Sequence, residues 1–110
     1  MRLMSFAATV DALLDGTKTV TRRTGWRCLR PGDQLQAVDR LPRAGPFRRL
    51  CVIEVVRVSR ERLNVITPAE VRREGLRDMT VPEFIEMFCA MSDRRVRPSD
   101  RVTRIEFKRL

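Results

Sequence analysis

The chemistry open to this 110-residue chain is narrowed by two missing residue types, because it contains no histidine and no tyrosine. Those side chains supply the commonest general bases and the phenolic acids of enzymes. Any proton transfer therefore falls to lysine, a carboxylate, a hydroxyl or a thiol. Lysine is itself scarce, since Lys18 and Lys108 are the only two lysines among 23 basic residues. Lys18 is the first candidate for a chemical role.

Lys18 lies in the segment Gly16-Thr17-Lys18-Thr19-Val20-Thr21-Arg22-Arg23. An amine that is buried or close to other cations can lose its proton and act as a base, which a guanidinium cannot. A surface lysine at a turn fits the same segment. The threonines Thr19 and Thr21 also fit plain β-propensity, and a regular strand would place Lys18 and Thr21 on opposite faces. A twist or bulge near Gly16 would bring the two together.

Glu74 is predicted to lie in the last turn of a helix that stops at Gly75. A carboxylate is unfavourable at that end because the helix dipole is negative there. A lysine or arginine from the first strands would compensate for it. An ordinary solvated glutamate is the alternative.

The charge of the chain points to a polyanionic partner. Lysine and arginine number 23 against 14 acidic residues, a net charge of +9, which favours association with nucleic acid. Biased composition with a solvated surface is the alternative. Trp26, the only tryptophan, follows Gly25 in a basic segment, where it could stack on a base or belong to the core.

The sequence contains no pattern that predicts a metal site, a cofactor site or a membrane-spanning segment. Cys28, Cys51 and Cys89 form no Cys-x-x-Cys pair and have no histidine to complete a metal site. No glycine-rich phosphate loop is present, so no cofactor is expected. Cys51 and Cys89 lie in apolar stretches and are predicted to be buried. Reduced thiols, no signal peptide and no membrane span predict a soluble, cytoplasmic protein.

The pattern of apolar residues predicts an α+β chain dominated by strands. Strands are expected over residues 3–6, 17–23, 34–38, 50–58 and 102–110. Helices are expected before Gly16, with Thr9 as a cap, from Thr67 to Gly75, and after Thr80. We expect a single domain over residues 1–110 with one core.

The strand over residues 50–58 changes its apolar phase. Its inward set begins as Cys51, Ile53 and Val55 and continues as Val56 and Val58. This shift predicts a bulge or a sharp bend. Small closed barrels need such bends.

The segment from Leu14 to Arg23 resembles the signature of the ASCH superfamily, Gly-x-Lys-x-x-(Glu or Thr)-x-Arg. Further similarity runs through residues 29–33, 52–56, 66–67 and 105–107, so it covers nearly the whole chain. The resemblance implies a PUA-like small β-barrel with flanking short helices. It also implies a role linked to nucleic acid, with the signature in a cleft beside the barrel and RNA or a nucleoside as the ligand.

One branch of that superfamily comprises small amidohydrolases that remove the acetyl group from N4-acetylcytidine with a lysine, a threonine and a glutamate. The resemblance assigns these roles to Lys18, Thr21 and Glu74. The lysine would activate the hydroxyl, and the glutamate would help to protonate the leaving amine.

The residues assigned to substrate contact are Arg22, Arg23 and Trp26, with no metal. The chain departs from that branch at Arg22, where an apolar residue is usual, and in the loop around Trp26. A non-catalytic RNA-binding module and an RNA-cleaving ASCH protein remain alternatives. The sequence does not define an oligomeric state.

Overall fold

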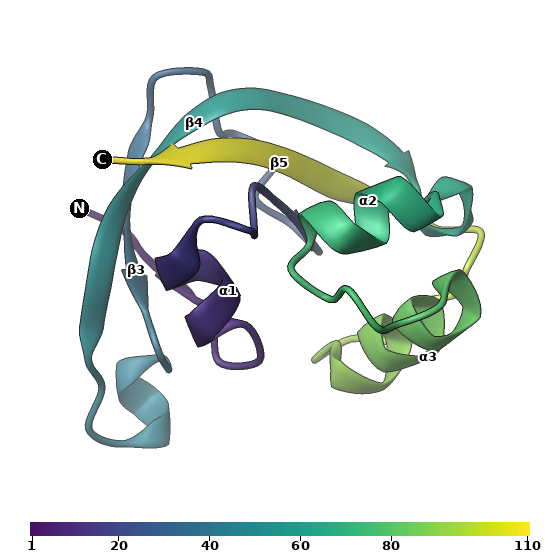
Figure 1. The fold of residues 1–110 in the computed structure, drawn as a ribbon, viewed down its shortest axis with the longest axis horizontal. Coiled ribbons are helices and arrows are strands. Elements are labelled where there is room, and N and C mark those ends of the chain that lie inside the picture. The colour runs from purple at the N-terminus through teal and green to yellow at the C-terminus, as the bar shows by residue number, and fades with distance from the viewer.

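A bent five-stranded sheet forms the frame of the molecule, and a computed structural model describes all of residues 1–110 (Figure 1). The strands are β1 (Leu3–Ser5), β2 (Val20–Arg23), β3 (Gln34–Val38), β4 (Arg49–Arg62) and β5 (Arg101–Arg109). Their order in the sheet is β1-β3-β4-β5-β2. The β1–β3 pair is parallel and the other pairs are antiparallel. The sheet is therefore mixed, and the α+β prediction is confirmed.

A bulge bends the long β4–β5 pair at the predicted place. The register between the two strands shifts between Val55 and Arg57. Ile53 and Val55 point into the core before the bulge, and Val58 packs against the core after it. The expectation that Val56 faces inward is wrong, since Val56 is the extra residue of the bulge and is exposed. An unpaired bulge residue leaves the alternation of the strand and can turn to solvent.

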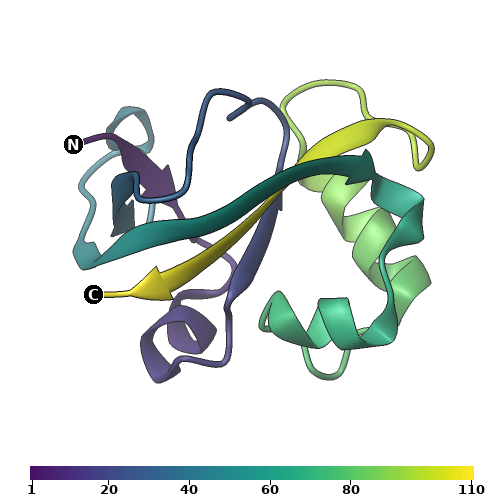
Figure 2. The ribbon, with the colours of Figure 1, turned by 90° about the horizontal axis from the view of Figure 1, so that it is seen from above.

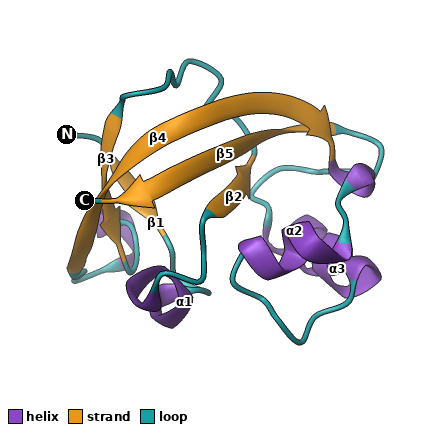
Figure 3. Ribbon diagram, turned by 45° about the horizontal axis from the view of Figure 1, so that its top comes forward, coloured by secondary structure: helices purple, strands orange, loops and turns teal.

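The sheet is curved but not closed into a barrel (Figure 3). No strand pairing joins the edge strands β1 and β2. One side chain crosses this gap instead, because Arg23 Nη2 donates a hydrogen bond to the carbonyl oxygen of Ser5 at 2.6 Å. The closed barrel expected from the family resemblance is thus not formed between these two edges.

The helices are short. They are α1 (Val10–Asp15), α2 (Pro68–Arg73) and α3 (Val81–Met91), with 3-10 turns at Pro42–Ala44 and Leu63–Val65. Thr67 and Thr80 cap α2 and α3 as predicted, and Thr80 forms a full capping box with Glu83. Thr9 makes no side-chain cap, which corrects the prediction for α1. None of these helices is long and apolar enough to cross a membrane.

The apolar interior is divided into two clusters, where one core was expected. The larger cluster lies on the sheet and includes Met4, Phe6 and Ile105. The smaller cluster joins α2, α3 and the start of β5, and it includes Phe84 and Val102. Viewed from above, α2 and α3 lie together at one end of the β4–β5 pair, while α1 lies toward the other end (Figure 2). This division leaves room for a cavity between the clusters.

The three cysteines form no disulfide, and Cys28 is exposed. Cys51 and Cys89 are only half-buried, so the prediction that both are buried is corrected. Each packs at the edge of one of the two clusters, because the divided interior is thin. Burial still raises the pKa of the Cys51 thiol.

Candidate functional site

Lys18 lies in an irregular link between α1 and β2. The helix ends at Gly16, whose φ of 85° is left-handed, and the Lys18 amide then donates to the carbonyl oxygen of Ala12 at 3.0 Å. Because β2 begins only at Val20, the predicted strand over residues 17–23 is three residues too long. The link removes Lys18 from the strict alternation of a strand. Lys18 and Thr21 consequently line the same cavity.

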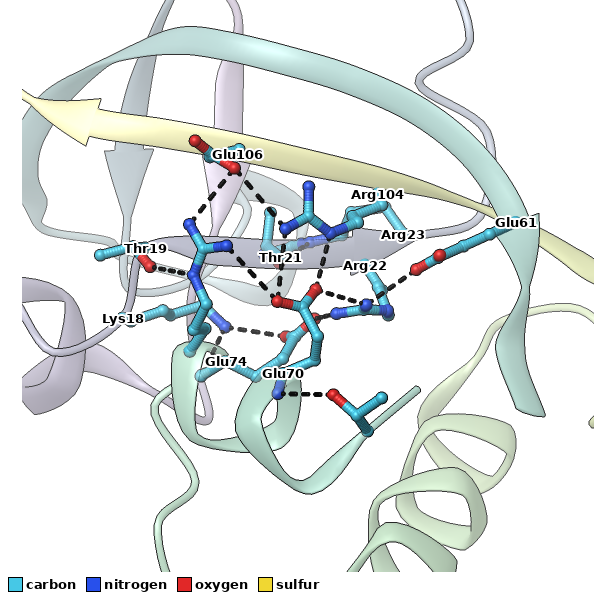
Figure 4. A network of polar contacts seen from close by, with 12 residues as sticks. Lys18, Thr19, Thr21, Arg22, Arg23, Glu61, Glu70, Glu74, Arg104 and Glu106 are labelled. Carbon is cyan, nitrogen blue, oxygen red and sulfur yellow. Dashed lines mark hydrogen bonds and ion pairs between the residues drawn. The ribbon is translucent and has the colours of Figure 1, made fainter. Parts of the chain in front are cut away.

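A buried ion pair joins Lys18 to the end of α2. Lys18 Nζ donates to Glu74 Oε1 at 3.2 Å and to the Glu74 carbonyl oxygen at 2.8 Å (Figure 4). Lys18 is 5% exposed and Glu74 is 3% exposed. Glu74 is the C-cap residue of α2, so the ammonium satisfies a terminal carbonyl and offsets the helix dipole at once. The sequence-based expectation that a strand cation compensates Glu74 agrees with this geometry.

Arg22 binds three carboxylates from two parts of the chain. Its guanidinium donates to Glu74 Oε2 at 3.0 Å, to Glu70 Oε1 at 2.8 Å and to Glu61 Oε1 at 2.7 Å. Its Nε is buried and has no hydrogen-bond partner. Arg22 lies opposite Arg104 in the β2–β5 ladder, and Glu70 also accepts from Arg104 Nε at 2.6 Å. A shared carboxylate thus offsets the repulsion of two facing cations.

Burial and neighbouring charges shift the pKa values of this cluster. Burial lowers the pKa of Lys18; the Glu74 carboxylate opposes this effect, and the cation of Arg23 adds to it. Burial also lowers the pKa of Arg23 to about 10, which leaves it a cation at neutral pH. The hydrogen bonds from Arg104 and Arg22 lower the pKa of Glu70 to about 2. Burial thus favours the neutral amine of Lys18, and a neutral amine can act as a base, which a guanidinium does not.

Arg23 orients the third candidate group. Its Nε donates to Thr21 Oγ1 at 3.0 Å, and its guanidinium carbon lies 4.9 Å from the centroid of the Phe6 ring. The two residues are two apart in β2, so they share a face. The Thr21 oxygen accepts this bond, which leaves the hydroxyl proton free for another partner.

A cavity of about 400 Å³ opens above these groups, between the two apolar clusters. Its polar floor contains Lys18, Thr21 and Glu74. Phe6 and Trp26 line it on the side of the sheet. On the opposite side, α3 contributes the apolar side chains Phe84, Met87, Phe88 and Met91. A concave site with apolar walls and a few convergent polar groups suits a small planar ligand.

Trp26 is half-buried and lines this cavity. Its φ of 53° is left-handed, which is uncommon for a bulky residue and costs backbone free energy. The Arg2 guanidinium lies 4.4 Å from the ring centroid, and the ring also packs against the larger cluster. The ring therefore both packs on the core and lines the cavity, and its stacking on a base stays a prediction.

All six residues singled out from the sequence line this one cavity: Lys18, Thr21, Arg22, Arg23, Trp26 and Glu74. Arg22 differs from the others, because its side chain is almost fully buried among carboxylates. Phe6 and the two additional carboxylates, Glu61 and Glu70, were not predicted as site residues from the sequence. No signal in the sequence marked either carboxylate as part of a site. No three of the chain's cysteine, aspartate and glutamate side chains are grouped as metal ligands.

The fold of this chain is similar to those of several solved structures. A crystal structure of an ASCH domain from Lactobacillus crispatus JV V101 superposes with a TM-score of 0.74 at 18% identity, over 98% of this chain and 78% of that chain. The chain has the ASCH-domain fold. A protein of Enterococcus faecalis V583 assigned to the DUF984 family matches this ASCH fold with a TM-score of 0.72 at 14% identity, over 100% of this chain and 76% of that chain. No family model and no curated protein matches the chain.

Gly75 lies close to Ala12 and Lys18 beneath the cavity, and we expect Gly75→Ala to lower the free energy of unfolding. Gly75 has a φ of 87°, and an added Cβ would lie 2.6 Å from the Ala12 Cβ and 3.1 Å from the Lys18 Cβ. The left-handed backbone and the overpacking together predict a loss of about 2 to 4 kcal/mol in the free energy of unfolding. Urea denaturation would measure this loss.

Gly32→Ala is the matched control for that substitution. Gly32 has a φ of 94°, but an added Cβ would meet nothing within 4 Å. Only the backbone cost of about 1 to 2 kcal/mol then applies. Equal losses at the two glycines would contradict the close packing of Gly75 against Lys18.

The lowered pKa of Glu70 predicts acid sensitivity for this ASCH fold. Its pKa falls from the ordinary 4.5 to about 2 in the folded chain, so its contribution is fully present above 4.5 and is lost as the pH falls toward 2. The contribution is about 2 kcal/mol, because the side chain is partly screened by water. Glu70→Gln should therefore cost this amount at pH 7 and much less near pH 2. Urea titrations at both pH values test it, and a pH-independent loss would contradict the pairing.

Proposed function

We propose that the cavity binds an RNA base or a modified cytidine nucleoside and hydrolyses its N4-acyl amide. One observation carries this proposal. A buried amine with a lowered pKa, a hydroxyl and a carboxylate line the floor of a single cavity, on Lys18, Thr21 and Glu74. These three residues have the types that the resemblance to the amidohydrolase branch implies. The ASCH fold supports a link to RNA at the level of the fold.

The proposed reaction begins at Thr21. Its Oγ attacks the carbonyl carbon of the amide, and the neutral Lys18 amine takes the hydroxyl proton. Lys18 Nζ lies 3.2 Å from Glu74 Oε1, so the proton can pass through the carboxylate to the leaving exocyclic amine. The C–N bond then breaks, and cytidine leaves. Water hydrolyses the acyl ester on Thr21, which releases the carboxylic acid and restores the hydroxyl.

Arg23 and Arg22 act as positioning residues in this scheme. The Arg23 Nε that donates to Thr21 Oγ1 at 3.0 Å would stabilise the negative charge that grows on this oxygen as its proton departs. Arg22 fixes the Glu74 carboxylate through Oε2 at 3.0 Å, which leaves Oε1 for Lys18. The apolar wall of α3 would keep bulk water away from the amine and strengthen these interactions.

A second candidate, a non-catalytic RNA-binding module, is favoured by the position of Arg22. A guanidinium beside Glu74 stabilises its carboxylate form, and that anion stabilises the ammonium form of Lys18. Both effects oppose the neutral amine that hydrolysis needs. In this candidate Lys18 would donate its remaining N–H to a base carbonyl, with no covalent step.

Turnover separates the two candidates. When the protein is in excess over N4-acetylcytidine, it should release cytidine and acetate. Chromatography of the nucleoside would measure this release. Absence of any release during prolonged single-turnover incubation would reject the amidohydrolase and leave the binding module. Binding of the unreacted nucleoside, measured by calorimetry in the same preparation, shows whether the cavity is occupied.

A further inference from the structure

A second cavity, of about 510 Å³, opens beside the first and is lined by arginines. We call it the arginine groove. It contains a side chain from each of six arginines: Arg27, Arg60, Arg62, Arg94, Arg95 and Arg101. All six are exposed. Only one of its eleven lining residues is hydrophobic, so the groove is not suited to an apolar partner.

The positive charge of the arginine groove is not neutralised within the chain. Its one carboxylate belongs to Asp100, which already accepts from the Arg97 amide at 2.9 Å and pairs with the Arg97 side chain at 3.3 Å. Arg60 and Arg62 donate to neutral oxygens, at 2.9 Å and 2.7 Å. The desolvation of Arg60 and the repulsion from Arg27 and Arg101 lower its pKa. Crowded cations of this kind are relieved by a bound polyanion.

The four other guanidinium groups of the groove make no ion pair and no side-chain hydrogen bond in the chain. They belong to Arg27, Arg94, Arg95 and Arg101. By contrast, Arg22, which lines the first cavity, and the neighbouring Arg73 and Arg104 of the same ionic cluster are all paired with glutamates. Four free guanidinium groups therefore lie together in the groove beside the cavity, whereas Arg22 in the cavity is paired. Guanidinium groups bind phosphate through two parallel hydrogen bonds, so four free ones suit more than one phosphate.

The arginine groove and the first cavity share two walls. In the loop after β2, Thr24 lines both, Trp26 lines the first cavity, and Arg27 lines the groove. In the segment after α3, Asp93 lines the first cavity and Arg94 lines the groove. In each wall, one residue lines the first cavity and its neighbour in sequence lines the groove. A ligand that fills the first cavity and continues past these walls reaches the groove.

We propose that the arginine groove binds the phosphate backbone next to the base in the first cavity, so that a nucleotide within single-stranded RNA is bound more tightly than a free nucleoside. The identity of the base site rests on the proposed function. An unpaired strand is favoured because its bases can enter a cavity without the free-energy cost of unpairing and unstacking a duplex. Trp26 and Arg27 are neighbours in one loop. In this arrangement the ring of Trp26 contacts the base in the first cavity, and the guanidinium of Arg27 contacts the phosphate in the groove.

The test compares two double substitutions that remove the same charge. Arg27→Gln/Arg94→Gln changes one residue in each wall of the groove. Arg40→Gln/Arg57→Gln is the control, because both residues are exposed, form no ion pair and line neither cavity. Circular dichroism would check that both variants are folded. Fluorescence anisotropy with a labelled single-stranded oligoribonucleotide of about ten residues measures binding across a salt series.

The groove variant should bind this RNA at least about tenfold more weakly than the control variant, and its log–log salt slope should be shallower by about 1.4, or 0.7 for each lost phosphate contact. The control variant should keep the slope of the unmodified protein within about 0.5. Equal affinities and slopes for the two variants would overturn the inference. So would the absence of RNA binding by the unmodified protein.

Failure of the groove and failure of the proposed function give different results. If the unmodified protein releases cytidine from free N4-acetylcytidine but the two variants bind RNA equally, the groove inference is wrong and the proposed function stands. If no cytidine is released but the groove variant alone loses RNA affinity, the groove inference stands and the enzymatic proposal is wrong.

Discussion

Lys18→Met is expected to abolish most of the hydrolysis of N4-acetylcytidine while the chain stays folded. Methionine has a similar length but cannot accept the Thr21 proton, so kcat should fall by roughly 100- to 10,000-fold. Burial lowers the pKa of Lys18, which means that its charge is costly in this place. Glu74 keeps its bond to Arg22 at 3.0 Å, and the free energy of unfolding should therefore change by less than about 2 kcal/mol.

The pH dependence of the unmodified protein provides a second readout for Lys18. Only the neutral amine accepts a proton, so kcat/KM should rise with pH through the lowered pKa and level off below the ordinary value of 10.5. A merely structural lysine would give no such limb in a pH range where the protein is stable. Full activity of Lys18→Met would reject its role as a base.

Glu74→Leu should cause the largest loss of stability of any single substitution in the cluster. Glu74 is 3% exposed and binds both Lys18 and Arg22. Removing one partner of a buried ion pair leaves uncompensated charge and costs about 3 to 5 kcal/mol. Glu74→Gln retains one acceptor oxygen, and its cost should be nearer 1 to 3 kcal/mol, or about the cost of an imperfect buried hydrogen bond.

Glu106→Gln is the control for the loss of a carboxylate. Glu106 pairs with Arg73 at 3.2 Å and its side chain is 28% exposed, so its removal should cost only about 0 to 1 kcal/mol. Urea denaturation of the three variants gives the comparison. If Glu74→Leu were no more costly than Glu106→Gln, the pairs at Glu74 would contribute little to the fold.

Local elements were largely predictable because their signals lie within a few residues. Thr67 and Thr80 cap their helices because each side-chain oxygen meets an amide three residues later. The change of apolar phase in β4 predicted its bulge, although it placed Val56 on the wrong side. Thr9 shows the limit of such signals, since a threonine before a helix has other conformations available and makes no cap.

Short-range sequence patterns could not predict which side chains meet at the cavity. Lys18 and Glu74 are 56 residues apart in sequence, and Arg22 and Glu61 are 39 apart. Pairing across such distances depends on the curvature of the sheet and on where α2 packs. The family resemblance suggested Lys18, Thr21 and Glu74 together, whereas it singled out neither Glu61 and Glu70 nor the apolar wall of α3.

The sequence alone determined the helix caps, the strand alternation and the chemistry open to a chain without histidine or tyrosine, because these depend on residue type and short spacing. Tertiary structure decided which of the 23 basic residues are neutralised and which remain free. Arg22 and Arg27 are five positions apart, yet one is buried among three glutamates and the other is exposed in the arginine groove. The free energy of a charge depends on its solvent exposure and its neighbours in space, and only the folded chain defines both.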